Sequence, residues 1–262
     1  MKLLPNQRLE LEKIINRNTG LVIVNGPTGS GKSTTLYTIL NHVNRREVNV
    51  VTLEDPVEVI INGVNQMMVN SKEGISFADG LRSVMRQDPD VIMVGEIRDE
   101  ETAAMAVRAA LTGHKVYTTI HSTEPREVYL RLEEMGIKSY LIRESLVGII
   151  SQRLIKMLCD SCKEEEIITY KDNKVKIYKK GDGCEKCNFT GYLGRALIIS
   201  VKDLKKKLVK LYDNNTILTN IQMVDNLNNL LLTGKISRLD YMEFIDREEL
   251  DFDYEGSFKA ES

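Results

Sequence analysis

Short apolar runs alternate with amphipathic stretches along the first half of the chain. The runs are uniformly apolar, as in Leu21–Val24, and so predict buried strands. We expect such strands at residues 21–24, 48–53, 91–94 and 115–120. Between them, apolar residues recur at helical spacing, which predicts helices at residues 32–43, 77–87, 99–111 and 124–135. Strands that alternate with helices predict an α/β fold, a mostly parallel sheet with helices on both faces.

The regions around this alternation are less regular. A short helix that includes Leu9 and Ile15 is expected before the first strand, and one or two short strands are expected over 57–69. Past residue 150, two cysteine pairs bracket a charged, weakly strand-like insert, a strand follows at 197–200, and the chain to about residue 247 is expected to be helical. The acidic stretch 251–256 is expected to be loose. We therefore predict a core at 1–157, a small module at 158–200 and a C-terminal helical region at 201–262.

Composition places the chain among soluble globular proteins. Of its 262 residues, 42% are hydrophobic and 28% are charged. Its longest apolar runs are far shorter than the roughly 20 residues that span a bilayer, and its first residues do not form a signal peptide, so we expect a cytoplasmic location. The net charge of −2 gives no overall field that favours nucleic acid or an anionic membrane.

The segment that follows the first strand carries a phosphate-binding pattern. GPTGSGKS at 26–33 matches the P-loop, with the required strand before it and helix after it. Backbone N–H groups of such a loop surround phosphate oxygens, Lys32 bridges the terminal phosphates, and Ser33 offers a hydroxyl to Mg²⁺. The sequence therefore predicts a site for ATP and Mg²⁺, with nucleotide-binding residues Gly26, Pro27, Thr28, Gly29, Ser30, Gly31, Lys32, Ser33 and Thr34.

Two further strands end on acidic residues. Glu54 and Asp55 follow the second strand, and Gly95-Glu96 follows the strand at 91–94. Because ligands of open α/β sheets bind outside the carboxyl ends of the strands, Glu54 and Glu96 should converge on the phosphates beside Lys32. One carboxylate can hold Mg²⁺ through water while the other orients the attacking water.

Four cysteines are arranged as two close pairs. Cys159 and Cys162 form the first pair, and Cys184 and Cys187 the second. Buried free thiols, a redox pair or disulfides are alternatives, but paired Cys-x-x-Cys spacing in a cytosolic chain favours a tetrahedral Zn²⁺. Four thiolates leave no open coordination position, so this zinc would be structural.

Several longer motifs together resemble one family, the ATPases of type II secretion and type IV pilus assembly. GPTGSGKSTTLY matches the family's P-loop, VTLEDPVE its aspartate box, and TGHKVYTTIHST its histidine box. The stretch LRSVMRQDPDVIMVGEIRDEETAAMAVRAALTGH matches the family's atypical Walker B, in which glutamate replaces aspartate. The resemblance covers residues 6–250 and implies a RecA-like P-loop NTPase core.

The resemblance also implies roles for individual residues. Glu54 is expected to position the water, Glu96 to hold Mg²⁺ with Ser33, and His121 to sense the terminal phosphate. His114 is implied in the same sensing role, although a structural histidine is an equal alternative. The family continues its histidine box as His-Thr-Asn-Asp, whereas this chain reads His121-Ser122-Thr123-Glu124, so any role of that asparagine is in doubt here.

By the same resemblance, the protein would be an ATP hydrolase. It would act as a homohexamer at the inner face of the cell membrane, working on an inner-membrane platform protein to drive type IV pilus assembly or type II secretion. The tetracysteine pattern favours the assembly or secretion branch over retraction. Family members carry domains ahead of the P-loop domain, and this chain begins 25 residues before Gly26, so slow turnover is expected.

Other interpretations remain at this stage. The chain can be a nucleotide-regulated assembly component with little turnover, a competence relative for DNA uptake, or a nucleic-acid translocase; near-neutral charge and the two boxes argue against the last, so no direct contact with nucleic acid is expected. Arg82, Arg86 and Arg98 can reach phosphate or a neighbouring subunit, or form ion pairs with nearby acids. A lysine-rich helix expected at 201–212 is a solvated face or a docking surface for the platform.

Overall fold

The structure is a computed structural model that describes residues 3–70, 74–170, 173–204, 221–250 and 258–260. The chain forms two compact units, and each is built from two separate stretches of sequence. Unit 1 comprises residues 1–152 and 201–219, and unit 2 comprises residues 153–200 and 220–262. Among the described residues, no helix is both long and apolar enough to cross a bilayer.

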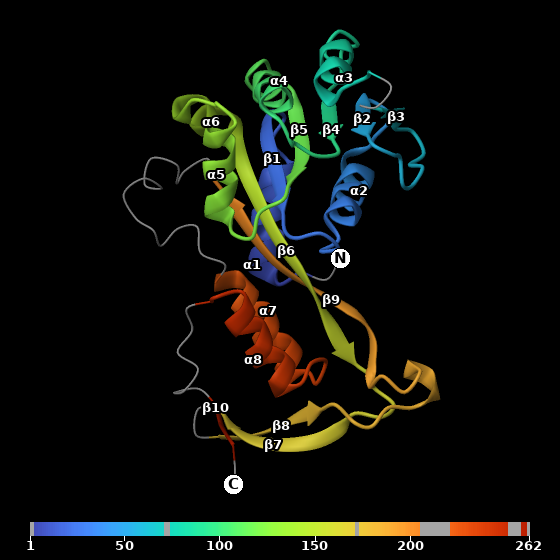
Figure 1. Ribbon diagram of the computed structural model, residues 1–262, viewed down its shortest axis with the longest axis vertical. Helices are drawn as coiled ribbons and strands as arrows, with labels where there is room; N and C mark the ends of the chain where they lie inside the picture. Colours follow the sequence, from blue (N-terminus) through green and yellow to red (C-terminus); the bar gives the residue numbers. More distant parts are fainter. Residues whose placement is uncertain (1–2, 71–73, 171–172, 205–220, 251–257, 261–262) are drawn as a thin grey trace. The chain divides into compact units, whose positions relative to one another are not determined.

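Unit 1 contains most of a sheet of seven strands in the order β3-β2-β4-β5-β1-β6-β9, whose last two strands, β6 and β9, each have residues in both units (Figure 1). The strands of this sheet are β1 (Gly20–Asn25), β2 (Val50–Glu54), β3 (Asn65–Met68), β4 (Val91–Val94), β5 (Lys115–Ile120), β6 (Leu146–Leu158) and β9 (Tyr192–Asp203). The pairs from β3 through to β6 are all parallel. This confirms the predicted mostly parallel α/β fold.

The helices of unit 1 cover both faces of the sheet. They are α1 (Pro5–Ile15), α2 (Lys32–Val43), α3 (Phe77–Val84), α4 (Glu100–Leu111), α5 (Pro125–Glu134) and α6 (Ser139–Ser145). In β1, Leu21 and Ile23 belong to the core with α3–α6, whereas Val22 and Val24 must point to the other face because side chains alternate along a strand. Helix α2 packs against β1 and β5. Burial on both faces explains why these strands read as continuous apolar runs.

Strand register determines where the candidate residues lie. In β1 and β5, Asn25 pairs with Ile120, and in β2 and β4, Leu53 pairs with Val94. The parallel strands therefore end together, and the residues that follow them share one edge of the sheet. This edge receives the P-loop, Glu54, Glu96 and His121.

Unit 2 has its own core. A three-stranded sheet, in the order β10-β7-β8, consists of β10 (Phe258–Ala260), β7 (Glu164–Tyr170) and β8 (Asn173–Lys179). Helices α7 (Ile221–Leu232) and α8 (Arg238–Arg247) bury Met223, Leu227 and Phe244 against apolar residues that include Ile168 and Ile177. The C-terminal helices thus pack with the insert between the cysteine pairs, whereas the predicted division assigned them to a separate region.

Most element predictions for unit 1 agree with the structure to within a few residues. The helix at 32–43 and the strand at 115–120 have the predicted bounds, and the helix expected at 99–111 begins one residue later, with Asp99 as its N-cap. Helix α6 and the long strand β6 were not predicted, and the strand expected at 197–200 extends over Tyr192–Asp203.

The lysine-rich helix expected at 201–212 is wrong at its start, because residues 201–203 end strand β9. Its remaining lysines, and the acidic stretch 251–256, lie outside the described residues.

Candidate functional site

The P-loop joins β1 to α2 and depends on glycines where the backbone is unusual. Gly31, the N-cap of α2, has φ = 85°, in the left-handed region that favours glycine. At Gly26, an added Cβ would lie 2.5 Å from the carbonyl oxygen of Gln152. The turn therefore tolerates only glycine at these two positions without strain.

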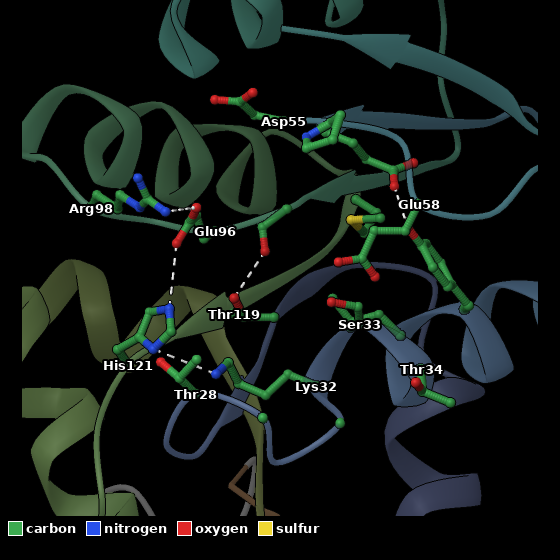
Figure 2. Close-up of a pocket in the computed structure, with 18 of the residues that line it drawn as sticks. Thr28, Lys32, Ser33, Thr34, Asp55, Glu58, Glu96, Arg98, Thr119 and His121 are labelled. Atoms are coloured by element: carbon green, nitrogen blue, oxygen red, sulfur yellow. Dashed lines mark hydrogen bonds and ion pairs between the residues drawn. The ribbon is translucent and has the colours of Figure 1, made fainter. Parts of the chain in front are cut away.

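The start of α2 fits a bound phosphate chain. Its N-cap forms no side-chain hydrogen bond, and its first turn contains no acidic residue. The first backbone N–H groups of the helix are thus left for an anion, which the helix dipole also favours. A cavity of about 550 Å³ opens at this point (Figure 2). The P-loop residues that line it are Thr28, Gly29, Gly31, Lys32, Ser33 and Thr34.

The remaining P-loop residues act from behind the cavity. The carbonyl oxygens of Gly26 and Pro27 accept hydrogen bonds from Nζ of Lys32, at 2.9 and 3.1 Å. Ser30 is buried, and its carbonyl oxygen accepts a hydrogen bond from Nε2 of Gln152 at 2.7 Å. These three residues shape the loop without lining the cavity.

A polar chain links three of the predicted site residues. Nζ of Lys32 lies 3.5 Å from Nδ1 of His121, and Nε2 of His121 lies 3.4 Å from Oε2 of Glu96 (Figure 2). An ammonium group only donates, so a hydrogen bond from Lys32 requires Nδ1 to accept, which only a neutral imidazole with its proton on Nε2 allows. His121 therefore lies between the P-loop lysine and the carboxylate of Glu96.

Neighbouring strands fix the position of Glu96. Gly95 donates its N–H to the carbonyl oxygen of Leu53 at 2.8 Å, and its own carbonyl oxygen accepts a hydrogen bond from Oγ1 of Thr119 at 2.8 Å. The glycine allows this close approach, because a Cβ there would lie 3.3 Å from the oxygen of Leu53. Glu96 is thereby held at the rim, where its Oε1 also pairs with Arg98 at 2.5 Å.

Glu54 lines the same cavity, but both of its carboxylate oxygens already accept hydrogen bonds. Oε1 accepts from Oγ1 of Thr52 at 2.6 Å and from Nε2 of Gln66 at 3.0 Å. Oε2 accepts from the hydroxyl of Tyr37 at 2.5 Å. Only 3% of the residue is exposed. Glu54 is therefore a buried, fully satisfied carboxylate.

Sequence reasoning missed Glu58, which follows Glu54 by one short turn. Glu58 is exposed, lines the cavity, and directs its carboxylate towards Ser33 (Figure 2). The signal was present in the sequence, because the motif VTLEDPVE contains a second glutamate. Three residues of irregular backbone separate it from the strand, so the strand pattern could not place its side chain.

His114 is not at this site. It precedes the first residue of β5, whereas His121 follows the last, so the two histidines lie at opposite ends of the strand. Its Nδ1 lies 3.0 Å from the carbonyl oxygen of Ala109, and it lines a different cavity. The prediction that His114 contacts the same phosphate as His121 is therefore wrong. The alternative, a hydrogen-bonded structural histidine, agrees with the position of His114.

Of the three arginines, only Arg98 lines the nucleotide cavity. Arg82 forms ion pairs with Asp79 and Glu101. Arg86 follows the end of α3 at Val84. For Arg82, the ion-pair alternative therefore agrees with the structure.

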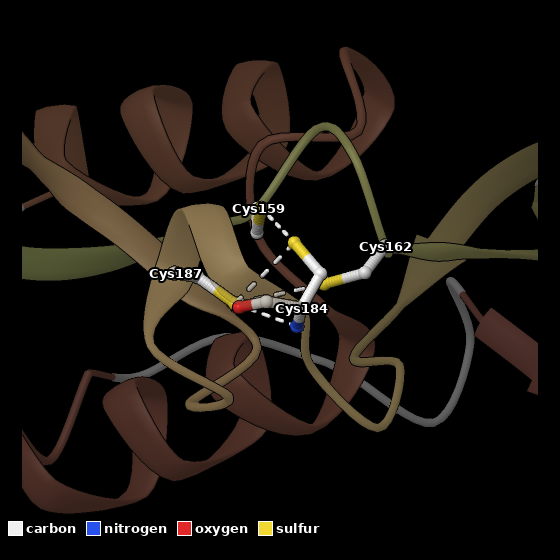
Figure 3. Close-up of side chains that lie close together, drawn as sticks. All are labelled: Cys159, Cys162, Cys184 and Cys187. Atoms are coloured by element: carbon white, nitrogen blue, oxygen red, sulfur yellow. Dashed lines mark hydrogen bonds between the residues drawn. The ribbon is translucent and has the colours of Figure 1, made fainter.

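The four cysteines of unit 2 form one cluster (Figure 3). Their sulfur atoms all lie within 4.8 Å of one another, and the closest pairs are 3.8, 3.8 and 3.9 Å apart. Four sulfurs around one Zn²⁺ at about 2.3 Å would be separated by about 3.8 Å. None of the four is in a disulfide. The donor set and spacing thus fit a tetrahedral thiolate site.

Backbone donors prepare this cluster for metal. The N–H groups of Cys184 and Gly191 lie 3.2 and 3.3 Å from Sγ of Cys187. The bond from Cys184 is the main reason that the pKa of the Cys187 thiol is lowered to about 6. A thiol that ionises this readily is ready to act as a metal ligand.

The fold and the cavity define a RecA-like P-loop NTPase core that carries a tetracysteine module. The family model described as "Type II/IV secretion system protein" matches residues 1–239, so the chain belongs to this family.

Individual relatives agree with this assignment. The type II secretion system protein E of Dickeya dadantii is 46% identical over 197 residues, which are 72% of this chain and 39% of that protein. The type IV pilus assembly ATPase PilB of Thermus thermophilus is 43% identical over 198 residues, covering 71% of this chain and 22% of PilB. A crystal structure of the pilus retraction motor PilT with bound ADP aligns at 31% identity and a TM-score of 0.63, over 92% of this chain and 64% of PilT. The chain thus spans less than half the length of these two sequence relatives.

Proposed function

We propose that this chain is the catalytic part of an ATP-hydrolysing motor that drives type II secretion or type IV pilus assembly. In this proposal it acts as a homohexamer on a platform protein at the inner face of the cell membrane. The relatives named as secretion protein E and as pilus assembly ATPase support this choice of machine. The presence of ADP in the similar PilT structure supports the choice of nucleotide.

One observation carries the proposal: the P-loop, Lys32, Glu58, Glu96 and His121 meet around a single cavity at the carboxyl edge of the sheet. Each has the chemistry that phosphoryl transfer to water requires. Backbone N–H groups and Lys32 bind the phosphates, and a carboxylate orients the attacking water. Ser33 and Glu96 would hold Mg²⁺, which would neutralise charge that develops on the phosphate oxygens.

His121 would report on the terminal phosphate. Nζ of Lys32 contacts carbonyl oxygens of the P-loop and lies near Nδ1 of His121. If Lys32 bound the terminal phosphate instead, its contact with Nδ1 of His121 would be lost. His121 could then turn towards the phosphate while it keeps its contact with Glu96.

Glu54 and Glu58 are the two candidates for orienting the attacking water, and their hydrogen bonds favour Glu58. Glu54 has three donors on its two oxygens and almost no exposure, so it would have to break existing bonds to bind water. Glu58 is exposed and faces Ser33. We therefore assign the water to Glu58 and a supporting role to Glu54.

The tetracysteine cluster would hold one structural Zn²⁺ through Cys159, Cys162, Cys184 and Cys187. All four positions would be filled by thiolates, so the metal would stabilise unit 2 and take no part in hydrolysis. A low rate for these 262 residues alone is also part of the proposal, because the matched regions make up only 39% and 22% of the two relatives.

The substitution Glu58→Gln tests the assignment. It keeps the size of the side chain but removes the negative charge that accepts a proton from water, so single-turnover hydrolysis of ATP should fall by at least about a hundredfold. Binding of a fluorescent ATP analogue should change by less than about twofold, because the phosphate contacts remain. The matched control is Glu124→Gln, an exposed glutamate at the start of α5, which should leave both quantities unchanged.

Two results would contradict this function. Hydrolysis by the Glu58→Gln variant at the unchanged rate would remove Glu58 from the chemistry. A wild-type chain that binds ATP tightly with Mg²⁺ but hydrolyses none would instead indicate a nucleotide-regulated assembly component.

A further inference from the structure

The segment 55–61, which carries Glu58, lies between two clamps. Tyr37 provides the first clamp from α2, and Gln66 provides the second from β3. Both side chains bind Glu54, the last residue of β2, from different sides. The three residues come from three elements and are separated by up to 29 positions in sequence.

Tyr37 holds the middle of the segment. Its hydroxyl donates to Oε2 of Glu54 at 2.5 Å, and its oxygen lies near the backbone N–H of Glu58. Burial, with a further contribution from Glu54, raises the pKa of Tyr37 to about 12, so the phenol stays protonated at neutral pH. Its proton is thus committed to Glu54, and its oxygen faces the N–H of Glu58.

Gln66 holds the end of the segment. Its Nε2 donates to Oε1 of Glu54 at 3.0 Å and to the carbonyl oxygen of Val59 at 2.9 Å. Its Oε1 accepts the N–H of Ile61 at 2.7 Å. The amide therefore satisfies two backbone groups of the segment while it is itself anchored on Glu54.

Side-chain packing anchors this segment at its end, where Ile61 is 5% exposed, but contributes little nearer to Glu58. Val59 and Ile60 are 55% and 84% exposed, so neither is fixed by a core. The contact with Tyr37 and the hydrogen bonds to Gln66 are therefore the described restraints nearest to Glu58. Tyr37 is also one helical turn from Ser33 on α2, so the first clamp ties Glu58 to the helix that carries the predicted magnesium ligand.

We propose that Tyr37 and Gln66 are positioning residues that, braced by the buried Glu54, hold Glu58 at the distance from Ser33 that hydrolysis requires. The proposal rests on the proposed function, because it takes Glu58 as the residue that orients water. Tyr37 lines the nucleotide cavity and Gln66 does not, and in this inference both act through Glu58.

The test begins with Tyr37→Phe, which deletes the shared oxygen and keeps the ring. Loss of the anchor should lower kcat by about tenfold to a hundredfold, because small misplacements of a catalytic group have effects of this size. The KM for ATP should change by less than about twofold, since the P-loop is untouched. The matched control is Tyr129→Phe: both tyrosines are 9% exposed, but the hydroxyl of Tyr129 donates to Ser139, far from the site in sequence and outside the cavity.

A double variant separates positioning from general damage. If Tyr37 acts through Glu58, adding Tyr37→Phe to Glu58→Gln should lower the rate no further, because the residue being positioned no longer contributes. Multiplicative effects would overturn the inference. Should Tyr37→Phe fold poorly, Gln66→Met cuts the second clamp at a half-buried position and should show the same fall in kcat and the same lack of effect on the Glu58→Gln background.

The results also distinguish this inference from the function on which it rests. A wild-type rate in Glu58→Gln would refute the assignment of the water to Glu58. If Glu58→Gln greatly lowered the rate of hydrolysis while Tyr37→Phe and Gln66→Met both kept the wild-type kcat, the assignment of the water to Glu58 would stand. The inference that Tyr37 and Gln66 position Glu58 would then be refuted.

Discussion

At the scale of single residues, two of the buried charged side chains, Glu54 and Lys115, differ in how well their charge is compensated. Glu54 receives three hydrogen bonds and is fully satisfied. Lys115, only 2% exposed, donates a hydrogen bond from Nζ to the carbonyl oxygen of Ile14 at 2.7 Å. Burial, together with the nearby charge of Arg17, lowers the pKa of Lys115 from 10.5 to about 7. A buried charge can thus be stabilising or costly, depending on its partners.

This lysine predicts a pH dependence of stability. Between about pH 7 and pH 10 the unfolded chain keeps the proton that folded Lys115 releases, so the unfolded state binds more protons and stability rises with pH. The contribution is lost as pH falls towards 7. The free energy of unfolding of the wild type should therefore rise, relative to Lys115→Met, by up to about 1.4 kcal/mol per pH unit.

Urea unfolding at pH 7.5, 8.5 and 9.5 would measure this difference, in steps chosen from the interval between the two pKa values. The exposed Lys13 on α1 offers the matched control, Lys13→Met. If the free energies of unfolding of the wild type and Lys115→Met changed with pH in parallel, burial would not disfavour the charged form of Lys115.

At the scale of elements, local sequence patterns predicted most helices and short strands of unit 1, but not the full length of the longer strands. The cap at Asp99 and the helical spacing of apolar residues specify α4 without reference to the rest of the fold. Strand β6 is different: its first part is buried on both sides, while Lys156 near its end is exposed. No single period describes such a strand, so sequence periodicity could not reveal its full length.

The site residues also divide into those that local sequence predicts and those that depend on the rest of the fold. The P-loop, Glu96 and His121 were predicted because each directly adjoins a recognisable strand. Glu58 and Gln66 could not be placed in this way, since their orientation depends on an irregular segment and on hydrogen bonds between distant residues. Sequence thus located the edge of the sheet that carries the site, but not the side chains that complete it.

The cap of α4 gives a prediction at this scale. Oδ1 of Asp99 accepts the N–H of Thr102 at 2.8 Å, and Oδ2 accepts the hydroxyl of the same threonine at 3.0 Å. Asp99→Ala should lower the free energy of unfolding by about 1 kcal/mol, because the first turn of α4 loses its acceptor. Asp99→Asn, which retains a capping oxygen, should lose much less in the same urea titration; equal losses would show that the cap contributes nothing specific.

At the scale of the whole molecule, the two units should depend differently on metal. Protein purified under reducing conditions without chelators should contain about one Zn²⁺ per chain, as four thiolates around one ion imply. In Cys162→Ser the metal should be lost and hydrogen exchange should accelerate in residues 153–200 and 220–250, because unit 2 loses its cross-link. Binding of ATP, which uses unit 1, should persist.

Glu58→Gln provides the control for that experiment, since its substitution lies in unit 1 and should leave the metal content unchanged. Zinc near zero in the reduced wild type would eliminate the structural-metal proposal. Loss of ATP binding together with the metal would instead show that the nucleotide site requires an intact unit 2.

The interleaved sequence of the two units has a practical consequence for anyone who wishes to dissect the protein genetically. The edge strand β9, which lies next to β6 in the sheet, comes after the insert in sequence, and its last residues belong to unit 1. A gene fragment that stops at residue 152 would leave β6 as a bare sheet edge, open to pairing with other chains in the test tube. Shortened versions are better made by replacing the insert with a brief turn than by cutting the chain at one point.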